Sequence, residues 1–166
     1  LTGWHLTDDA SDLDKWTLPA VSLAPGAYLL VYASGKDRSV VGSQLHTNFN
    51  LSSSGEYLAL VAPDGESIAS EYASQFPEQR SKVSYGMLTD AGGVHSETLR
   101  YFTPATPGAP NSGAGYAGFA ATPDFSVPHG FFTSAFNVSI ADTTPGATIR
   151  YTVDGSAPSQ TNGTVY

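Results

Sequence analysis

Short apolar stretches separated by turn-forming residues are the feature that most limits what this chain can fold into. Stretches such as Tyr28–Ala33 and Gly55–Ala62 are rich in strand-favouring residues and too short for a free-standing helix. No window sustains the i, i+3, i+4, i+7 spacing of an amphipathic helix. The pattern therefore predicts an all-β protein, with either an irregular loop or a single helical turn over residues 35–47.

Two turns are defined best by their residue types. Proline presets φ at the second position of a turn and glycine tolerates positive φ at the third, so Pro25-Gly26 predicts a type II turn. Asp64-Gly65 suits a tight turn between strands. It predicts a hairpin in which the strand over 55–62 is followed by a returning strand over 66–72.

Proline and glycine cluster in Thr103–Gly115, a composition that cannot build a sheet. Strand patterns resume near residue 122. We therefore divide the chain into a domain over 1–111, a Gly/Pro/Ala-rich linker over 112–121 and a partial second β module over 122–166. Both ends of the chain lie inside strand patterns, so we expect a fragment of a longer polypeptide.

The charge and cysteine content exclude several classes of protein. A net charge of −8 with no basic cluster argues against nucleic-acid binding. No apolar run reaches the roughly 18–20 residues that a membrane span needs. The chain has no cysteine, which rules out disulfides and thiol chemistry. That composition fits either a cytosolic protein or an exported bacterial protein stabilised by core packing alone.

A set of short motifs occurs in a fixed order over residues 1–111. The set comprises Leu1-Thr2-Gly3-Trp4-His5-Leu6, Trp16-Thr17-Leu18-Pro19, Leu23-Ala24-Pro25-Gly26, His46-Thr47-Asn48-Phe49-Asn50-Leu51, Ser84-Tyr85-Gly86 and Thr106-Pro107-Gly108-Ala109-Pro110-Asn111. Together these motifs resemble the bacterial lamin-tail domain, which implies an immunoglobulin-like β-sandwich. The family's strands that precede the first motif are missing here, so we expect that they were cut away or are supplied by another chain.

A second set of motifs follows the linker. It comprises Pro128-His129-Gly130-Phe131-Phe132, Thr144-Pro145-Gly146-Ala147-Thr148-Ile149-Arg150-Tyr151-Thr152 and Asp154-Gly155-Ser156-Ala157-Pro158. These motifs resemble the repeat at the C-terminal end of chitobiases and in fibronectin-III-associated modules. The likeness stops before the remaining strands of that module, which implies a partial second β-sandwich. The two resemblances together imply a large exported bacterial protein, located outside the cell, at its surface or in the periplasm.

Four carboxylates lie close together near the start of the chain, at Asp8, Asp9, Asp12 and Asp14. Carboxylate oxygens are the ligands that Ca²⁺ prefers, so this run is a candidate calcium site. Its spacing does not match an EF-hand loop. The alternative is a solvated turn before Trp16, since Asp favours turn geometry. No other cofactor is expected.

Aromatic residues are the candidate ligand-binding groups. Trp4 and Trp16 could either stack on sugar rings or fill the core, where aromatic side chains bury a large area. Phe131 and Phe132 are neighbours, and neighbours on a strand face opposite sides. One of the two is therefore expected either at the surface or at the contact between the two domains.

The sequence carries no recognisable catalytic constellation. It has no His-Glu-x-x-His helix, no Gly-x-Ser-x-Gly elbow and no phosphate-binding loop. We therefore expect no enzyme but a non-catalytic interaction or spacer module of a larger exported bacterial surface protein. Its partners would be other domains of the same polypeptide, other surface proteins or glycans. The alternative is a carbohydrate-binding accessory module that directs a neighbouring enzyme domain to polysaccharide.

Overall fold

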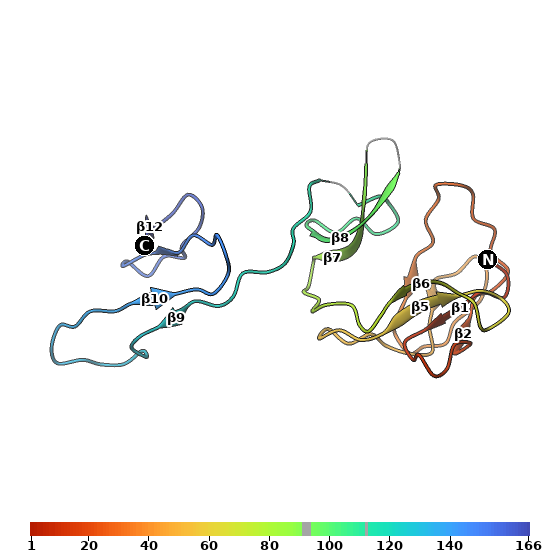
Figure 1. Ribbon diagram of the computed structural model, residues 1–166, viewed down its shortest axis with the longest axis horizontal. Coiled ribbons are helices and arrows are strands. Elements are labelled where there is room, and N and C mark those ends of the chain that lie inside the picture. The colour runs from red at the N-terminus through yellow and green to blue at the C-terminus, as the bar shows by residue number, and fades with distance from the viewer. Residues whose placement is uncertain (91–93, 112) are drawn as a thin grey trace. The chain divides into compact units, whose positions relative to one another are not determined.

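The computed structural model describes residues 1–90, 94–111 and 113–166 (Figure 1). The chain divides into two compact units, Leu1–Ala117 and Gly118–Tyr166. Every regular element in the described residues is a strand, which confirms the all-β class. No helix that could cross a membrane occurs in that part of the chain. Ser112, in the expected linker, lies outside the described residues, and the boundaries at 111 and 121 stay a prediction.

A four-stranded antiparallel sheet organises the first unit. It contains β1 (His5–Thr7), β2 (Trp16–Thr17), β5 (Leu58–Val61) and β6 (Ile68–Tyr72), in the order β2-β1-β5-β6 (Figure 1). Strands β5 and β6 pair from Leu58 opposite Tyr72 to Val61 opposite Ile68, which confirms the hairpin expected over 55–72.

Two strand pairs complete the first unit. Strands β3 (Val31–Tyr32) and β4 (Leu45–His46) pair in parallel, and β7 (Ser84–Thr89) pairs with β8 (His95–Phe102) in an antiparallel hairpin. Strand β3 is shorter than the stretch from Tyr28 to Ala33 suggested, because only two of its residues find partners in β4.

The segments on either side of β3 behave as loops. The type II turn at Pro25-Gly26 is confirmed: Gly26 has φ of +75°, and the Ala27 N–H donates to the Ala24 carbonyl at 3.0 Å. Residues 35–47 contain no helical turn, and the loop is instead closed by an isolated bridge between Arg38 and His46.

The core of the first unit is a small cluster of Trp16, Leu18, Leu45 and Phe49. Partly buried side chains from the main sheet and from the β3–β4 pair pack against this cluster, among them those of β1, β3 and β5. Apolar side chains from two layers thus meet over one core, consistent with a β-sandwich. Burial of the Thr7 hydroxyl costs little free energy, because this hydroxyl donates a hydrogen bond to the Asp12 carbonyl at 2.7 Å.

The second unit contains two short antiparallel pairs. Strand β9 (Asp124–Phe125) pairs with β10 (Ile140–Ala141), and β11 (Arg150–Tyr151) pairs with β12 (Thr164–Val165). The strands are shorter than the apolar stretches around them. None of the side chains in residues 118–166, all of which are described, is buried. Two-stranded pairs of this length are marginal on their own, so little apolar packing holds this unit together.

We predict that Trp16→Ala destabilises the first unit by about 3–5 kcal/mol, because the indole is only 3% exposed and its removal leaves a cavity in a four-residue core. Urea denaturation followed by circular dichroism measures the change. Val40→Ala, at an exposed loop position, is the matched control and should shift stability by less than about 0.5 kcal/mol. A loss below about 1 kcal/mol for Trp16→Ala would mean that the indole is not a core residue.

We predict that the Asp64 carboxylate in the β5–β6 turn makes the stability of the fold depend on pH. The Ser67 hydroxyl and the backbone N–H groups of Ser67 and Glu66 donate to the Asp64 carboxylate and lower its pKa to about 2. A carboxyl with a depressed folded-state pKa stabilises the fold above its unfolded pKa of about 4, and loses that effect as the pH falls through its folded pKa. The melting temperature of Asp64→Ala should therefore lie below that of the native chain at pH 5–7, with the gap closing toward pH 2. A gap that is constant between pH 6 and pH 2 would contradict this role.

Candidate functional site

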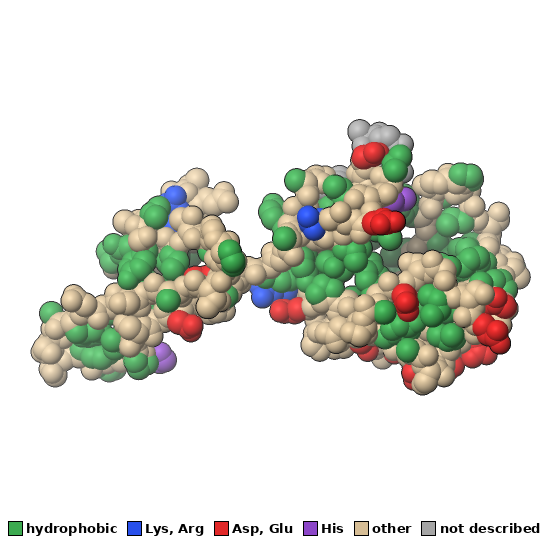
Figure 2. All heavy atoms as spheres, viewed as in Figure 1, with side chains coloured by type: hydrophobic (Ala, Val, Ile, Leu, Met, Phe, Trp, Pro, Cys, Tyr) green, Lys and Arg blue, Asp and Glu red, His purple; other side chains and the backbone are tan. Residues whose placement is uncertain are grey.

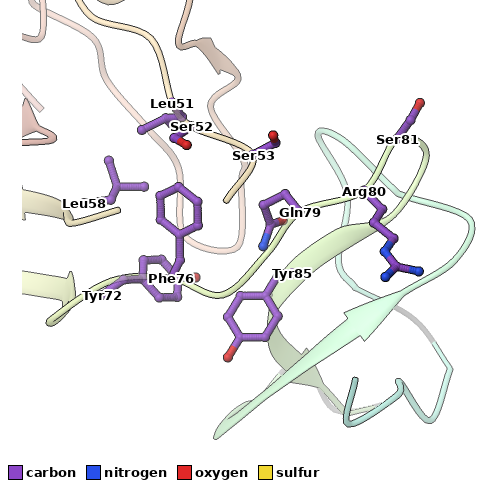
Figure 3. Close-up of a pocket in the computed structure, with 10 residues that line it drawn as sticks. All are labelled: Leu51, Ser52, Ser53, Leu58, Tyr72, Phe76, Gln79, Arg80, Ser81 and Tyr85. Carbon is purple, nitrogen blue, oxygen red and sulfur yellow. The ribbon is translucent and has the colours of Figure 1, made fainter. Parts of the chain in front are cut away.

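An aromatic-lined hollow of the first unit lies beside the end of the β5–β6 hairpin, and we call it the unit 1 cleft (Figure 3). Its volume is about 440 Å³, within the range of small-ligand pockets. Three segments line it: the turn at 51–53, the β5 and β6 strands, and the connection from Phe76 to Tyr85. Figure 3 shows Phe76 and Tyr72 on one side, and Gln79 and Tyr85 on the other.

Backbone hydrogen bonds hold residues 76–79 against residues 53–56 at the cleft. The Phe76 N–H donates to the Glu56 carbonyl at 2.9 Å, and the Gln79 N–H donates to the Ser53 carbonyl at 2.7 Å. Gly55 has φ of +98°, and a Cβ there would lie 2.1 Å from the Phe76 carbonyl oxygen. Only glycine allows this close approach of backbone to backbone, so the shape of the cleft depends on Gly55.

The apolar wall of the cleft is a row of aromatic rings. The ring centroids of Tyr72 and Phe76 are 6.4 Å apart, and those of Tyr72 and Tyr85 are 6.0 Å apart. Tyr85 packs in turn on Tyr101, whose hydroxyl donates to the Glu78 carbonyl at 2.8 Å. Burial, and then the neighbouring Tyr85, raise the pKa of Tyr72. The Tyr72 hydroxyl therefore stays protonated at neutral pH and can donate a hydrogen bond.

The rim of the cleft is polar. Ser52, Ser53 and Ser81 contribute hydroxyls, and the Gln79 amide donates to the Pro77 carbonyl at 2.7 Å, which fixes its orientation. The Arg80 guanidinium pairs with Glu78 at 3.1 Å. None of the described residues lining the cleft is His, Cys, Asp or Glu. The lining thus offers a ligand both apolar rings and hydrogen-bonding groups.

The two tryptophans that the sequence offered as ligand-binding groups lie at the core instead. Trp16 is buried and cannot present its ring to a ligand, so the stacking interpretation is wrong for this residue. Trp4 is half-buried and packs against the same cluster. Trp16 lies opposite Leu6 in the paired strands, and Trp4 precedes Leu6 by two residues, so the three side chains face the same layer.

The phenylalanine pair of the second unit lies at the surface. Phe131 is fully exposed and Phe132 is about half exposed, at 52%. Phe132 contacts Phe136 with ring centroids 4.2 Å apart and planes inclined at 56°, so the two rings do not form a flat platform. Together with Phe125 and Val138 they line a shallow apolar groove of about 450 Å³. Hydrophobic side chains are visible at the surface of this unit in Figure 2.

The acidic run near the start of the chain is organised as a turn. Asp8 forms an ion pair with Lys15 at 2.7 Å. The Ser11 hydroxyl and backbone N–H donate to the Asp9 carboxylate and lower its pKa. Among the described residues, no three His, Cys, Asp or Glu side chains gather as metal ligands would, and this includes Asp12 and Asp14. Calcium binding here stays a prediction without geometric support.

The sequence did not reveal the unit 1 cleft. Its aromatic rings are spread over three segments that no motif joins, and the backbone contacts of Gly55 bring those segments together. One local signal existed: the polar, proline-interrupted stretch at 73–81 separates two strand patterns that both contain tyrosine. Such a stretch predicts a loop near aromatic side chains but not which of them it approaches.

Comparison with known proteins gives one match. The family model of the chitobiase/beta-hexosaminidase C-terminal domain matches residues 127–166, which supports the resemblance found for the second module. No curated protein and no solved structure matches the chain. The lamin-tail resemblance of residues 1–111 therefore stays a prediction.

We predict that Gly55→Ala is costlier than Gly26→Ala. Both glycines have positive φ, but a Cβ at Gly26 meets nothing within 4 Å, whereas one at Gly55 meets the Phe76 carbonyl. Gly26→Ala should cost about 1 kcal/mol from backbone strain alone, and Gly55→Ala at least about 1 kcal/mol more. Urea denaturation of the two variants side by side measures the difference. Equal costs would mean that segments 52–56 and 76–79 are not held in contact.

Proposed function

We propose that this chain is a non-catalytic accessory region of a larger exported protein, in which it acts as an interaction or spacer segment. The observation that carries the proposal is the match of residues 127–166 to a domain named for its place at the C-terminal end of chitobiases and β-hexosaminidases. A domain of that kind is an appendage to a catalytic domain. Fold alone would not justify this step, since one fold serves many functions.

The organisation of the chain agrees with such a role. Two units are separated near a segment rich in proline and glycine, as in proteins that space their domains. The unit 1 cleft is lined by aromatic and polar side chains rather than by a nucleophile with an adjacent base.

The location and partners follow from the same proposal. An exported protein without cysteine has no disulfides to stabilise it in oxidising surroundings. Its stability must then come from core packing, which the Trp16 cluster provides here. The partners would be other domains of the same polypeptide, other surface proteins or glycans. We propose a bacterial surface, extracellular or periplasmic location on this basis.

The test uses the native polypeptide with and without residues 1–166. We expect its intact mass to exceed the 17.3 kDa of this chain. Removal of 1–166 should leave turnover of a soluble substrate unchanged and reduce attachment to cell-surface material. The proposal would be overturned if removal abolished turnover while attachment stayed the same, because these residues would then belong to the catalytic machinery.

A second candidate function is carbohydrate binding that places a neighbouring enzyme on polysaccharide. The observation that favours it is the exposure of Phe131, Phe132 and Phe136 within the matched residues, since exposed aromatic rings stack on sugars. Co-sedimentation of the chain with insoluble chitin and cellulose tests it. Phe131→Ala should reduce the bound fraction, whereas Val153→Ala, another exposed apolar residue of the same unit, should not. An equal bound fraction for both variants would argue against stacking by Phe131.

A further inference from the structure

We infer that the unit 1 cleft is a binding site for a neutral sugar unit of a glycan, separate from the exposed phenylalanines of the second unit. The inference goes beyond the accessory role proposed above. It concerns residues outside the segment that carries that proposal. If the cleft does not bind sugar, the proposed accessory role still stands. If the accessory role is refuted, sugar binding by the cleft can still be tested independently.

The aromatic wall supplies the apolar half of a sugar site. A sugar ring has faces of C–H groups that pack on aromatic rings. Tyr72 and Tyr85 are half-buried, with ring centroids 6.0 Å apart and planes inclined at 46°, so each offers a separate surface to a sugar rather than one flat platform. Phe76, which is only 6% exposed, forms the closed end of the cleft rather than a stacking surface. The cleft volume of about 440 Å³ is adequate for a small saccharide.

The polar groups supply the other half. A sugar carries a hydroxyl on most ring carbons and needs several donors and acceptors around one apolar face. The cleft provides serine hydroxyls, the Gln79 carbonyl oxygen and two phenol hydroxyls. Within the described residues, no hydrogen-bond partner occupies the Tyr72 or Tyr85 hydroxyl, so both remain able to bind a ligand.

The charge balance favours a neutral sugar over an acidic one. The guanidinium at the rim belongs to Arg80, and Glu78 pairs with it at 3.1 Å. An anionic ligand would therefore meet a cation that already has a carboxylate beside it, in a chain of net charge −8.

The density of polar groups also favours a sugar over a proline-rich peptide. Aromatic grooves that bind polyproline use flat ridges and few donors, because a peptide in that conformation offers about one free carbonyl per residue. Here Ser52, Ser53 and Gln79 lie on the same side of the cleft above the aromatic rings (Figure 3). A proline-rich peptide is the competing outcome of the experiment below.

The test is a titration of the ¹⁵N-labelled chain with soluble tetrasaccharides of N-acetylglucosamine, glucose and mannose, observed by NMR. We expect at least one of them to give saturable shifts at the amides of residues 51–53 and 72–85. Tyr72→Phe and Tyr85→Phe each remove one hydroxyl and should weaken binding about fivefold. Tyr57→Phe is the matched control, because the Tyr57 hydroxyl bonds to Glu71 and does not line the cleft.

Three results would overturn the inference. The first is the absence of shifts at 51–53 and 72–85 with all three tetrasaccharides in the native chain, a readout that depends on no variant. The second is an affinity that the double variant Tyr72→Phe/Tyr85→Phe leaves unchanged. The third is a shift of the same amides by a proline-rich peptide in place of every sugar. Unchanged melting temperatures of the variants show that any weakening comes from the lost hydroxyls and not from unfolding.

Discussion

The burial of Trp16, Leu18, Leu45 and Phe49 in one small cluster is the constraint on which the rest of the first unit depends. These four side chains come from β2, from β4 and from the segments that follow them, and they join the main sheet to the β3–β4 pair. The chain has no cysteine, so no disulfide joins the two layers, and the apolar packing of these side chains holds them together. The β5–β6 hairpin is held by this core through β1, and its far end supports the cleft.

The parts of the fold that sequence predicted well are those determined by neighbouring residues. The type II turn at Pro25-Gly26 and the hairpin around Asp64-Gly65 depend on local φ preferences and on side chains that bond within a few residues. Strand lengths were predicted poorly, as at Tyr28–Ala33, because a strand extends only as far as a partner lies beside it. Apolar composition shows that a segment favours a strand, but the partner is set by tertiary structure.

The same division between local and distant information applies to the candidate site. The sequence argument for Phe131 assumed a strand whose neighbouring residues face opposite sides, but Phe131 and Phe132 lie outside every strand and both are exposed. Burial of Trp16 could not be separated from sugar stacking until its partners in the core were known. The unit 1 cleft is formed by a backbone contact between Gly55 and Phe76, residues that no spacing rule connects. The sequence shows where a glycine permits positive φ, but not which distant backbone segment that glycine approaches.

The molecule is thus an all-β chain whose two units differ in kind. The first has a core and a hollow lined by tyrosines, and the second has exposed phenylalanines and a match to the chitobiase/beta-hexosaminidase C-terminal domain. The central claim is that the first unit is the part that holds a sugar. The most direct measurement is of intermolecular NOEs between a bound tetrasaccharide and the aromatic ring protons of the chain. We predict NOEs to Tyr72 and Tyr85; NOEs confined to Phe131, Phe132 and Phe136 would contradict the claim.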